Sequence, residues 1–150
     1  MKSTPFVFVL LLSAASFLSA QCPEFQLVAL QSLQRAEAGA KESKILDYGF
    51  DLGKTSAGSR LYNKCWLGTS NGKQYYQQII VCSLAANTIQ YMTLDEGHYR
   101  NLRASIEERR SSTFSGGNGP NEYIGKMFRY NFSRQSMDGA EYFVVLISFK

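Results

Sequence analysis

The chain has 150 residues, of which 45% are hydrophobic and 19% charged, and its formal net charge at pH 7 is +4. This composition is typical of a globular domain and excludes a disordered or fibrous chain. Charges of both signs are interspersed without a basic stripe, so no nucleic-acid partner is predicted. No window reaches the roughly 20 apolar residues of a membrane helix, so no membrane span is expected.

The first twenty residues have the pattern of a secretory signal peptide. Met1-Lys2 is a short charged start, residues 6–12 form an apolar run, and small residues continue to Ala20 before the polar Gln21. We expect cleavage near Ala20, which leaves residues 21–150 as a single exported domain in the periplasm or outside the cell. A lipid anchor on Cys22 is not expected, because bacterial lipoprotein signals place a small residue before the cysteine.

Two segments are predicted to be helical. Apolar side chains recur at helical spacing over residues 23–46, and Gly49 is a suitable stop. Thr93 and Glu96 match a capping box that begins a second helix, which ends at about Arg110. The apolar stripe of this second helix and its two expected ion pairs are Tyr99, Leu102 and Ile106, with Glu96–Arg100 and Arg103–Glu107.

The middle of the chain predicts a β-hairpin. Residues 61–67 and 74–83 have strand chemistry, and Asn71-Gly72 between them is the preferred centre of a two-residue hairpin turn. Residues 87–93 should return along the second of these strands. Residues 51–59 are rich in Gly, Ser and Thr and are predicted to be a loop.

The C-terminal part returns to strand chemistry. A short strand is expected at residues 112–114, then a Gly-rich loop at 115–121, then two strands joined by a turn at Asp138-Gly139. These two strands are predicted at residues 122–132 and 141–149. The second contains an apolar run at 142–147, which is typical of a central strand covered on both faces.

The predicted fold is therefore α+β, with elements in the order α-β-β-β-α-β-β(-β). Five to six strands should form a mostly antiparallel sheet, with two helices packed on one face.

The three cysteines leave at least one thiol unpaired within a monomer. A hairpin centred on Asn71-Gly72 places Cys65 opposite Gln78, four residues along the ladder from Cys82. That separation exceeds the roughly 7 Å that a disulfide allows between Cα atoms, so a bond between these two is not expected. Cys22 could pair with Cys65 or with Cys82, and the unpaired cysteines are expected to be buried.

No motif predicts catalytic chemistry. The glycines around residues 49–55 lack the spacing of a phosphate-binding loop, no ligand spacing indicates a metal site, and no cofactor is implied. His98 is the only histidine, and no orienting group for a nucleophilic dyad can be identified beside it.

Two surfaces are candidate binding sites. In the predicted register, Tyr62 and Trp66 share one sheet face with Tyr75, which is either covered by a helix or open for docking a protein or a glycan. The Gly-rich loop, with Gly116, Gly117 and Asn118, is the second candidate, because loops often carry partner contacts.

Several short stretches resemble small uncharacterised exported α+β proteins of Bacteroidetes-type bacteria. The stretches are Leu18-Ser19-Ala20-Gln21, Tyr48-Gly49-Phe50, Tyr62-Asn63-Lys64-Cys65, Thr93-Leu94-Asp95-Glu96 with Tyr99 and Leu102, and residues 142–147. The resemblance covers most of the mature chain and implies no activity and no functional residues.

The sequence favours a non-enzymatic exported protein that binds another protein or a glycan. The alternatives are an exported hydrolase with a site assembled around His98, and a carrier with a closed apolar cavity between helices and sheet. Nothing in the sequence predicts an oligomeric state.

Overall fold

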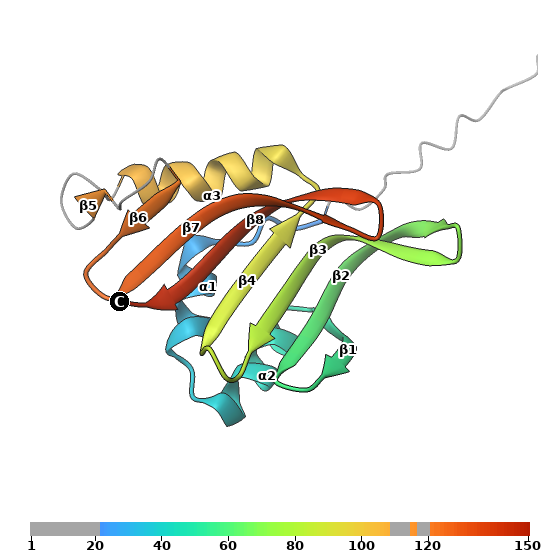
Figure 1. Cartoon of the computed structure of the whole chain (residues 1–150), viewed down its shortest axis with the longest axis horizontal. Coiled ribbons are helices and arrows are strands. Elements are labelled where there is room, and N and C mark those ends of the chain that lie inside the picture. Colours follow the sequence, from blue (N-terminus) through green and yellow to red (C-terminus); the bar gives the residue numbers. More distant parts are fainter. Residues whose placement is uncertain (1–21, 109–114, 117–120) are drawn as a thin grey trace, which may run out of the picture.

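The computed structural model of the chain describes residues 22–108, 115–116 and 121–150. Within these residues, three helices accompany one antiparallel sheet of eight strands in the order β1-β2-β3-β4-β8-β7-β6-β5 (Figure 1). The elements are α1 Leu27–Arg35, α2 Ala38–Asp47, β1 Asp51–Ser56, β2 Ser59–Ser70, β3 Lys73–Ser83, β4 Thr88–Thr93, α3 Glu96–Glu108, β5 Ser115–Gly116, β6 Glu122–Ile124, β7 Phe128–Met137 and β8 Ala140–Phe149. The predicted α+β class with an antiparallel sheet is confirmed, whereas five to six strands and two helices are too few.

The predicted helix at residues 23–46 is two helices. Ala36 and Glu37 are extended, with ψ of 140° and 153°, and they separate α1 from α2. Leu33 and Ile45 are both fully buried in the same core. Along one straight helix these two side chains would point about 120° apart. The break lets both reach the sheet, so tertiary packing overrides the helical propensity of the segment.

The predicted loop at residues 51–59 is mostly the edge strand β1. It pairs with β2, and all six of its residues are exposed, so no pattern of buried side chains indicates a strand in the sequence.

The preceding helix, α2, ends as predicted. Gly49 has φ of +80°, and its N–H donates to the Leu46 carbonyl, as glycine commonly does after a helix C-terminus.

Both predicted two-residue turns are confirmed. Asn71 and Gly72 have φ of 51° and 74°, and Asp138 and Gly139 have φ of 55° and 90°. Positive φ at both positions suits the right-handed twist of the flanking strands. The return of residues 87–93 along β3 is also confirmed, as β4.

A β-bulge shifts the predicted register of the first hairpin. Ser70 pairs with Lys73 as expected, but the pairing shifts between Trp66 and Gly68, so that Lys64, not Cys65, lies opposite Gln78. A shift of one residue transfers every following side chain to the other face. The predicted assignment of side chains to the two faces of this hairpin is therefore wrong beyond the bulge.

The predicted strand at residues 122–132 is also divided. β6 ends at Ile124, the Gly125 N–H donates to the Phe128 carbonyl in a tight turn, and β7 follows. Ser115 and Gly116, predicted as loop, form the short strand β5. The strand predicted at 112–114 lies outside the described residues.

The second predicted helix is capped two residues later than expected. Asp95, rather than Thr93, accepts a hydrogen bond from the backbone N–H of His98, while Thr93 Oγ1 accepts from the Asp95 N–H. The ion pairs Glu96–Arg100 and Arg103–Glu107 are present. Leu102 and Ile106 are buried as expected.

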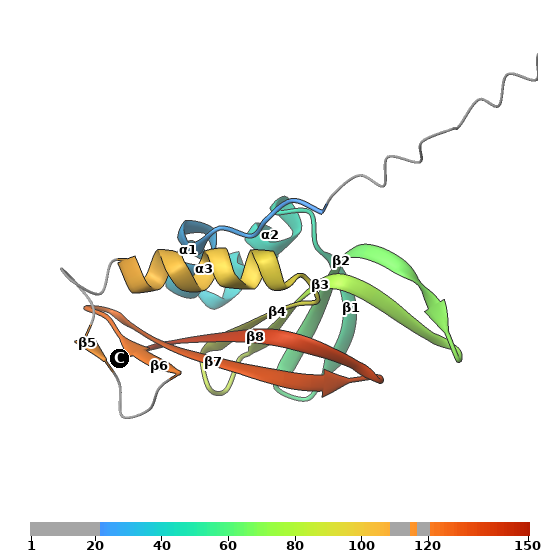
Figure 2. The ribbon, with the colours of Figure 1, turned by 90° about the horizontal axis from the view of Figure 1, so that it is seen from above.

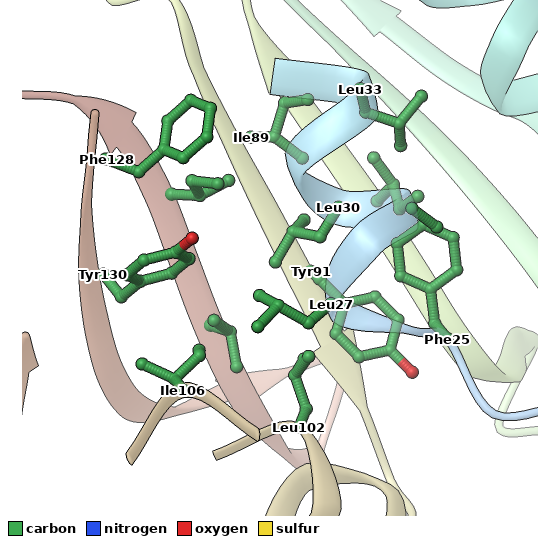
Figure 3. Close-up of a cluster of buried hydrophobic side chains, with 14 of the residues drawn as sticks. Phe25, Leu27, Leu30, Leu33, Ile89, Tyr91, Leu102, Ile106, Phe128 and Tyr130 are labelled. Carbon is green, nitrogen blue, oxygen red and sulfur yellow. The ribbon is translucent and has the colours of Figure 1, made fainter. Parts of the chain in front are cut away.

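All three helices lie on one face of the sheet (Figure 2). Apolar side chains from the N-terminal segment, α1 and α3 meet those of β4 and β7 in the space between the layers (Figure 3). A few buried polar contacts hold the layers together. Gln31 donates to the Tyr130 hydroxyl at 2.7 Å, and Lys41 donates to Asn87 Oδ1 at 2.7 Å.

A disulfide ties the start of the described chain to the sheet. It joins Cys22 to Cys65 across a sequence separation of 43 residues, and Cys82 is a buried free thiol. Nearby, Gln78 Nε2 donates to the Pro23 carbonyl at 2.6 Å. Of the two partners left open for Cys22, the structure selects Cys65, which precedes the bulge and has φ of 59°.

We predict that Cys22→Ser and Cys65→Ser each lower the free energy of unfolding by about 4 kcal/mol, because each frees a loop of this length in the unfolded chain. Urea denaturation under oxidising conditions measures the change. The double variant should be no less stable than either single variant. A loss of under about 1 kcal/mol in the single variants would contradict a stabilising role for this bond.

Candidate functional site

The sheet has a gap where β4 ends. Thr93, its last residue, pairs with Gln78 of β3 on one side and with Phe143 of β8 on the other. Beyond this point the chain leaves for α3, so the outer parts of the β2–β3 and β7–β8 hairpins extend past β4 with no strand between them (Figure 1).

Tyrosine side chains close the gap. The Tyr142 hydroxyl donates to the Tyr76 carbonyl at 3.0 Å, and the Tyr75 hydroxyl donates to the Asp138 carbonyl at 3.0 Å. Lys73 Nζ lies 3.1 Å from Asp138 Oδ1 and joins the two hairpin turns. Because β4 no longer pairs with these strands, the tyrosines supply hydrogen bonds that a neighbouring strand would otherwise make.

A pocket of about 180 Å³ lies beside this closure, on the face of the sheet opposite the helices. Ile79 and Tyr142 are its buried members, and Tyr75 and Tyr76 are half-buried. The complete lining is Gly53, Lys54, Leu61, Asn63, Gln74, Tyr75, Tyr76, Ile79, Met137, Asp138 and Tyr142. The pocket is thus aromatic and aliphatic within and polar at its rim, as small-ligand sites commonly are.

Gly53 makes room for one of the polar groups. A Cβ atom at this position would overlap the amide nitrogen of Asn63 and contact Leu61. The missing side chain of the edge strand therefore allows the Asn63 amide to lie against β1 within the pocket lining. Such close approach is one of the physical reasons for glycine in a strand.

The predicted binding residues are not brought together. Tyr75 lines the pocket, but Tyr62 is 1% exposed in the core under the helices and pairs with Ile80. Trp66 is 61% exposed and is absent from the pocket lining. The shared face predicted for Tyr62 and Tyr75 is wrong, because the bulge in β2 separates them.

The second predicted surface is only partly described. Gly116 lies in β5 and pairs with Tyr123, while Gly117 and Asn118 lie outside the described residues.

The pocket residues that the sequence analysis missed are Asn63, Tyr76 and Tyr142. Both hairpin turns are visible in the sequence, but no local signal indicates that the two hairpins meet.

His98 does not gain a catalytic partner among the described residues. Its Nε2 lies 3.7 Å from Asp95 Oδ2, and the same Asp95 caps α3. Gln77 also reaches this carboxylate, at 3.4 Å. Asp95 and His98 are three residues apart at the start of α3, and their contact belongs to the cap of this helix. Neither residue lines the pocket.

Cys82 is the one free thiol described, and its surroundings do not activate it. Burial raises the pKa of this thiol to about 11, although Lys41 and Arg60 favour the thiolate. Burial also lowers the pKa of Lys41. A nucleophilic cysteine requires a lowered pKa and access to substrate, so this residue has the properties of a core side chain.

Comparison with known protein families, with curated proteins and with solved structures found no match to this chain. Within the described part of the chain, no group of three or more His, Cys, Asp or Glu residues could hold a metal ion. None of the three described helices is long and apolar enough to cross a membrane.

We predict that the stability of the protein falls as the pH rises from 9 toward 11 and that Cys82 contributes to the fall. Its folded pKa of about 11 lies above the ordinary value of 9.0, so folding favours the protonated thiol, and this stabilisation is lost as the thiol ionises. Urea denaturation across this range should show a shallower fall for Cys82→Ala than for the wild type. Parallel curves for the two proteins would contradict the assignment.

Proposed function

We propose that the protein is an exported binding module that holds a macromolecular ligand against the face of the sheet opposite the helices. The observation that carries this proposal is the tyrosine-lined pocket at the end of β4. Half-buried tyrosines offer a large contact area at a small loss of conformational entropy, and this is why they are frequent at binding surfaces.

Export is supported by two independent features. The N-terminal segment has the pattern of a signal peptide, and Cys22 and Cys65 form a disulfide. Disulfides persist mainly in oxidising compartments such as the periplasm and the extracellular space.

A non-catalytic role is favoured by the chemistry of the lining. Its ionisable side chains are two charged groups at the rim and three tyrosines. Burial raises the pKa of Tyr142, and its hydroxyl is already engaged with the Tyr76 carbonyl. A group with this environment serves as a hydrogen-bond donor rather than as a base at neutral pH. The proposal therefore assigns the pocket to recognition.

We predict that a partner retained from periplasm or culture medium by the exported protein is lost by Tyr75→Ala and kept by Trp66→Ala. Tyr75 forms a wall of the pocket, whereas Trp66 is a more exposed aromatic residue outside it. Affinity capture followed by protein and carbohydrate analysis of the retained material measures the difference. Equal retention by Tyr75→Ala and wild type, or loss with Trp66→Ala alone, would contradict the proposed site.

A further inference from the structure

The first described residues, 22–26, form a strap on the helix side of the sheet (Figure 2). Cys22 and Phe25 are only 4% and 5% exposed. The Pro23 carbonyl between them accepts a hydrogen bond from Nε2 of the fully buried Gln78, at 2.6 Å. The chain is therefore held against the sheet from its first described residue onward.

Most of the contacts of this strap are non-covalent. The Phe25 ring stacks on the Tyr91 ring at 5.1 Å, and it meets the rings of Tyr48 and Phe50 edge to face, each at 5.6 Å. Segments near a chain end that are held only by such contacts open by local unfolding, without loss of the whole fold. The strap without its disulfide would therefore open from time to time.

The disulfide removes this freedom at the start of the strap. It holds the Cα atom of Cys22 at 5.9 Å from that of Cys65, and Cys65 lies within β2. The bond persists even when Phe25 leaves its aromatic contacts. Once it has formed, Cys22 stays at the sheet in every conformation in which β2 remains paired.

The expected signal cleavage site lies directly beside this anchor. Cleavage after Ala20 leaves Gln21 alone between the scissile bond and Cys22. Consecutive Cα atoms are about 3.8 Å apart, so covalent geometry keeps the scissile bond within roughly 6 Å of the Cys22 Cα atom. Proteolysis requires open, accessible backbone around the scissile bond. The oxidised domain leaves a single residue to provide it.

We infer that the signal segment is removed before the Cys22–Cys65 bond forms, so that the disulfide is the closing covalent step of maturation. This inference rests on the export that is part of the proposed function. Hydrolysis of the Ala20–Gln21 amide consumes one water and leaves a carboxylate on Ala20 and an amine on Gln21. The two thiols then lose two electrons and two protons to a disulfide oxidant, which leaves as two thiols. A precursor that oxidised first would keep the apolar run of residues 6–12.

The test is a cleavage assay on the full-length precursor in detergent, with the disulfide either reduced or formed with oxidised glutathione. Thiol counting in denaturant distinguishes the two forms, because the chain has three cysteines and only Cys82 stays free after oxidation. A type I signal peptidase is added, and the product mass reports cleavage after Ala20. We expect the oxidised precursor to be cleaved about tenfold more slowly or less, because cleavage follows the population in which the strap is open.

A spacer shows whether the anchor causes the resistance. A flexible insertion of about eight Gly and Ser residues between Gln21 and Cys22 adds up to roughly 26 Å of reach, and it should restore cleavage of the oxidised precursor. The same insertion between Asn71 and Gly72, which are exposed at a hairpin turn, is the matched control. It should leave the oxidised precursor resistant.

Two cysteine variants separate the bond from oxidation in general. Under oxidising conditions, Cys65→Ser should be cleaved about as fast as the reduced wild-type precursor, because the strap is free to open. Cys82→Ala keeps the disulfide and should be cleaved as slowly as the oxidised wild type.

Equal cleavage of the oxidised and reduced wild-type precursors would overturn the inference, as would continued resistance of the oxidised precursor with the spacer after Gln21. If neither the reduced precursor nor this spacer variant is cleaved after Ala20, the first twenty residues are not a cleaved signal, and both export and the inference fail. The affinity capture described above is read separately. Its failure, with cleavage in the expected order, would contradict the binding function alone.

Discussion

The hydrogen bond from the Tyr142 hydroxyl to the Tyr76 carbonyl closes the one place where the sheet is interrupted. β4 ends at Thr93 because the chain turns into α3, whose first turn is capped by Asp95. Two hairpins then continue without a strand between them and meet through tyrosines. The pocket lies beside this closure. The candidate site is thus a consequence of where one strand stops.

The two faces of the sheet have different roles in this account. The face under the helices carries most of the buried apolar side chains and accounts for the stability of the fold. The opposite face has a smaller buried cluster, formed by Ile79, Met92, Tyr142 and Val144, and the pocket lies beside it. The three helices cover one face only, and the other face has no helical layer over it.

Local features of the fold could be predicted from the sequence. The turns at Asn71-Gly72 and Asp138-Gly139 and the stop at Gly49 depend on residues that tolerate positive φ, and that preference is visible without tertiary information. β1 could not be predicted, because an edge strand with every residue exposed has no buried alternation to reveal it. The break between α1 and α2 at Ala36 could not be predicted either. It depends on the positions at which Leu33 and Ile45 pack against the sheet, and these are set by the tertiary structure.

The site was predictable only in part, for a related reason. Tyr75, a candidate from the sequence, lines the pocket, but the bulge between Trp66 and Gly68 places Tyr62 on the other face. No local sequence pattern indicates this bulge. Asn63 and Tyr142 are far apart in sequence and come together only through the pairing of β2, β3, β4 and β8. Their shared position requires the full order of strands, which hairpin signals alone do not determine.

The central claim is tested most directly by mapping amide chemical shifts of the ¹⁵N-labelled protein during titration with the ligand recovered by affinity capture. The largest shifts should cluster at the pocket residues Gly53, Asn63, Tyr75, Tyr76 and Tyr142, while amides of α1, α2 and α3 should be unaffected. Shifts confined to the helices, or an unchanged spectrum, would contradict the claim that the gap beyond β4 is where this protein holds its ligand.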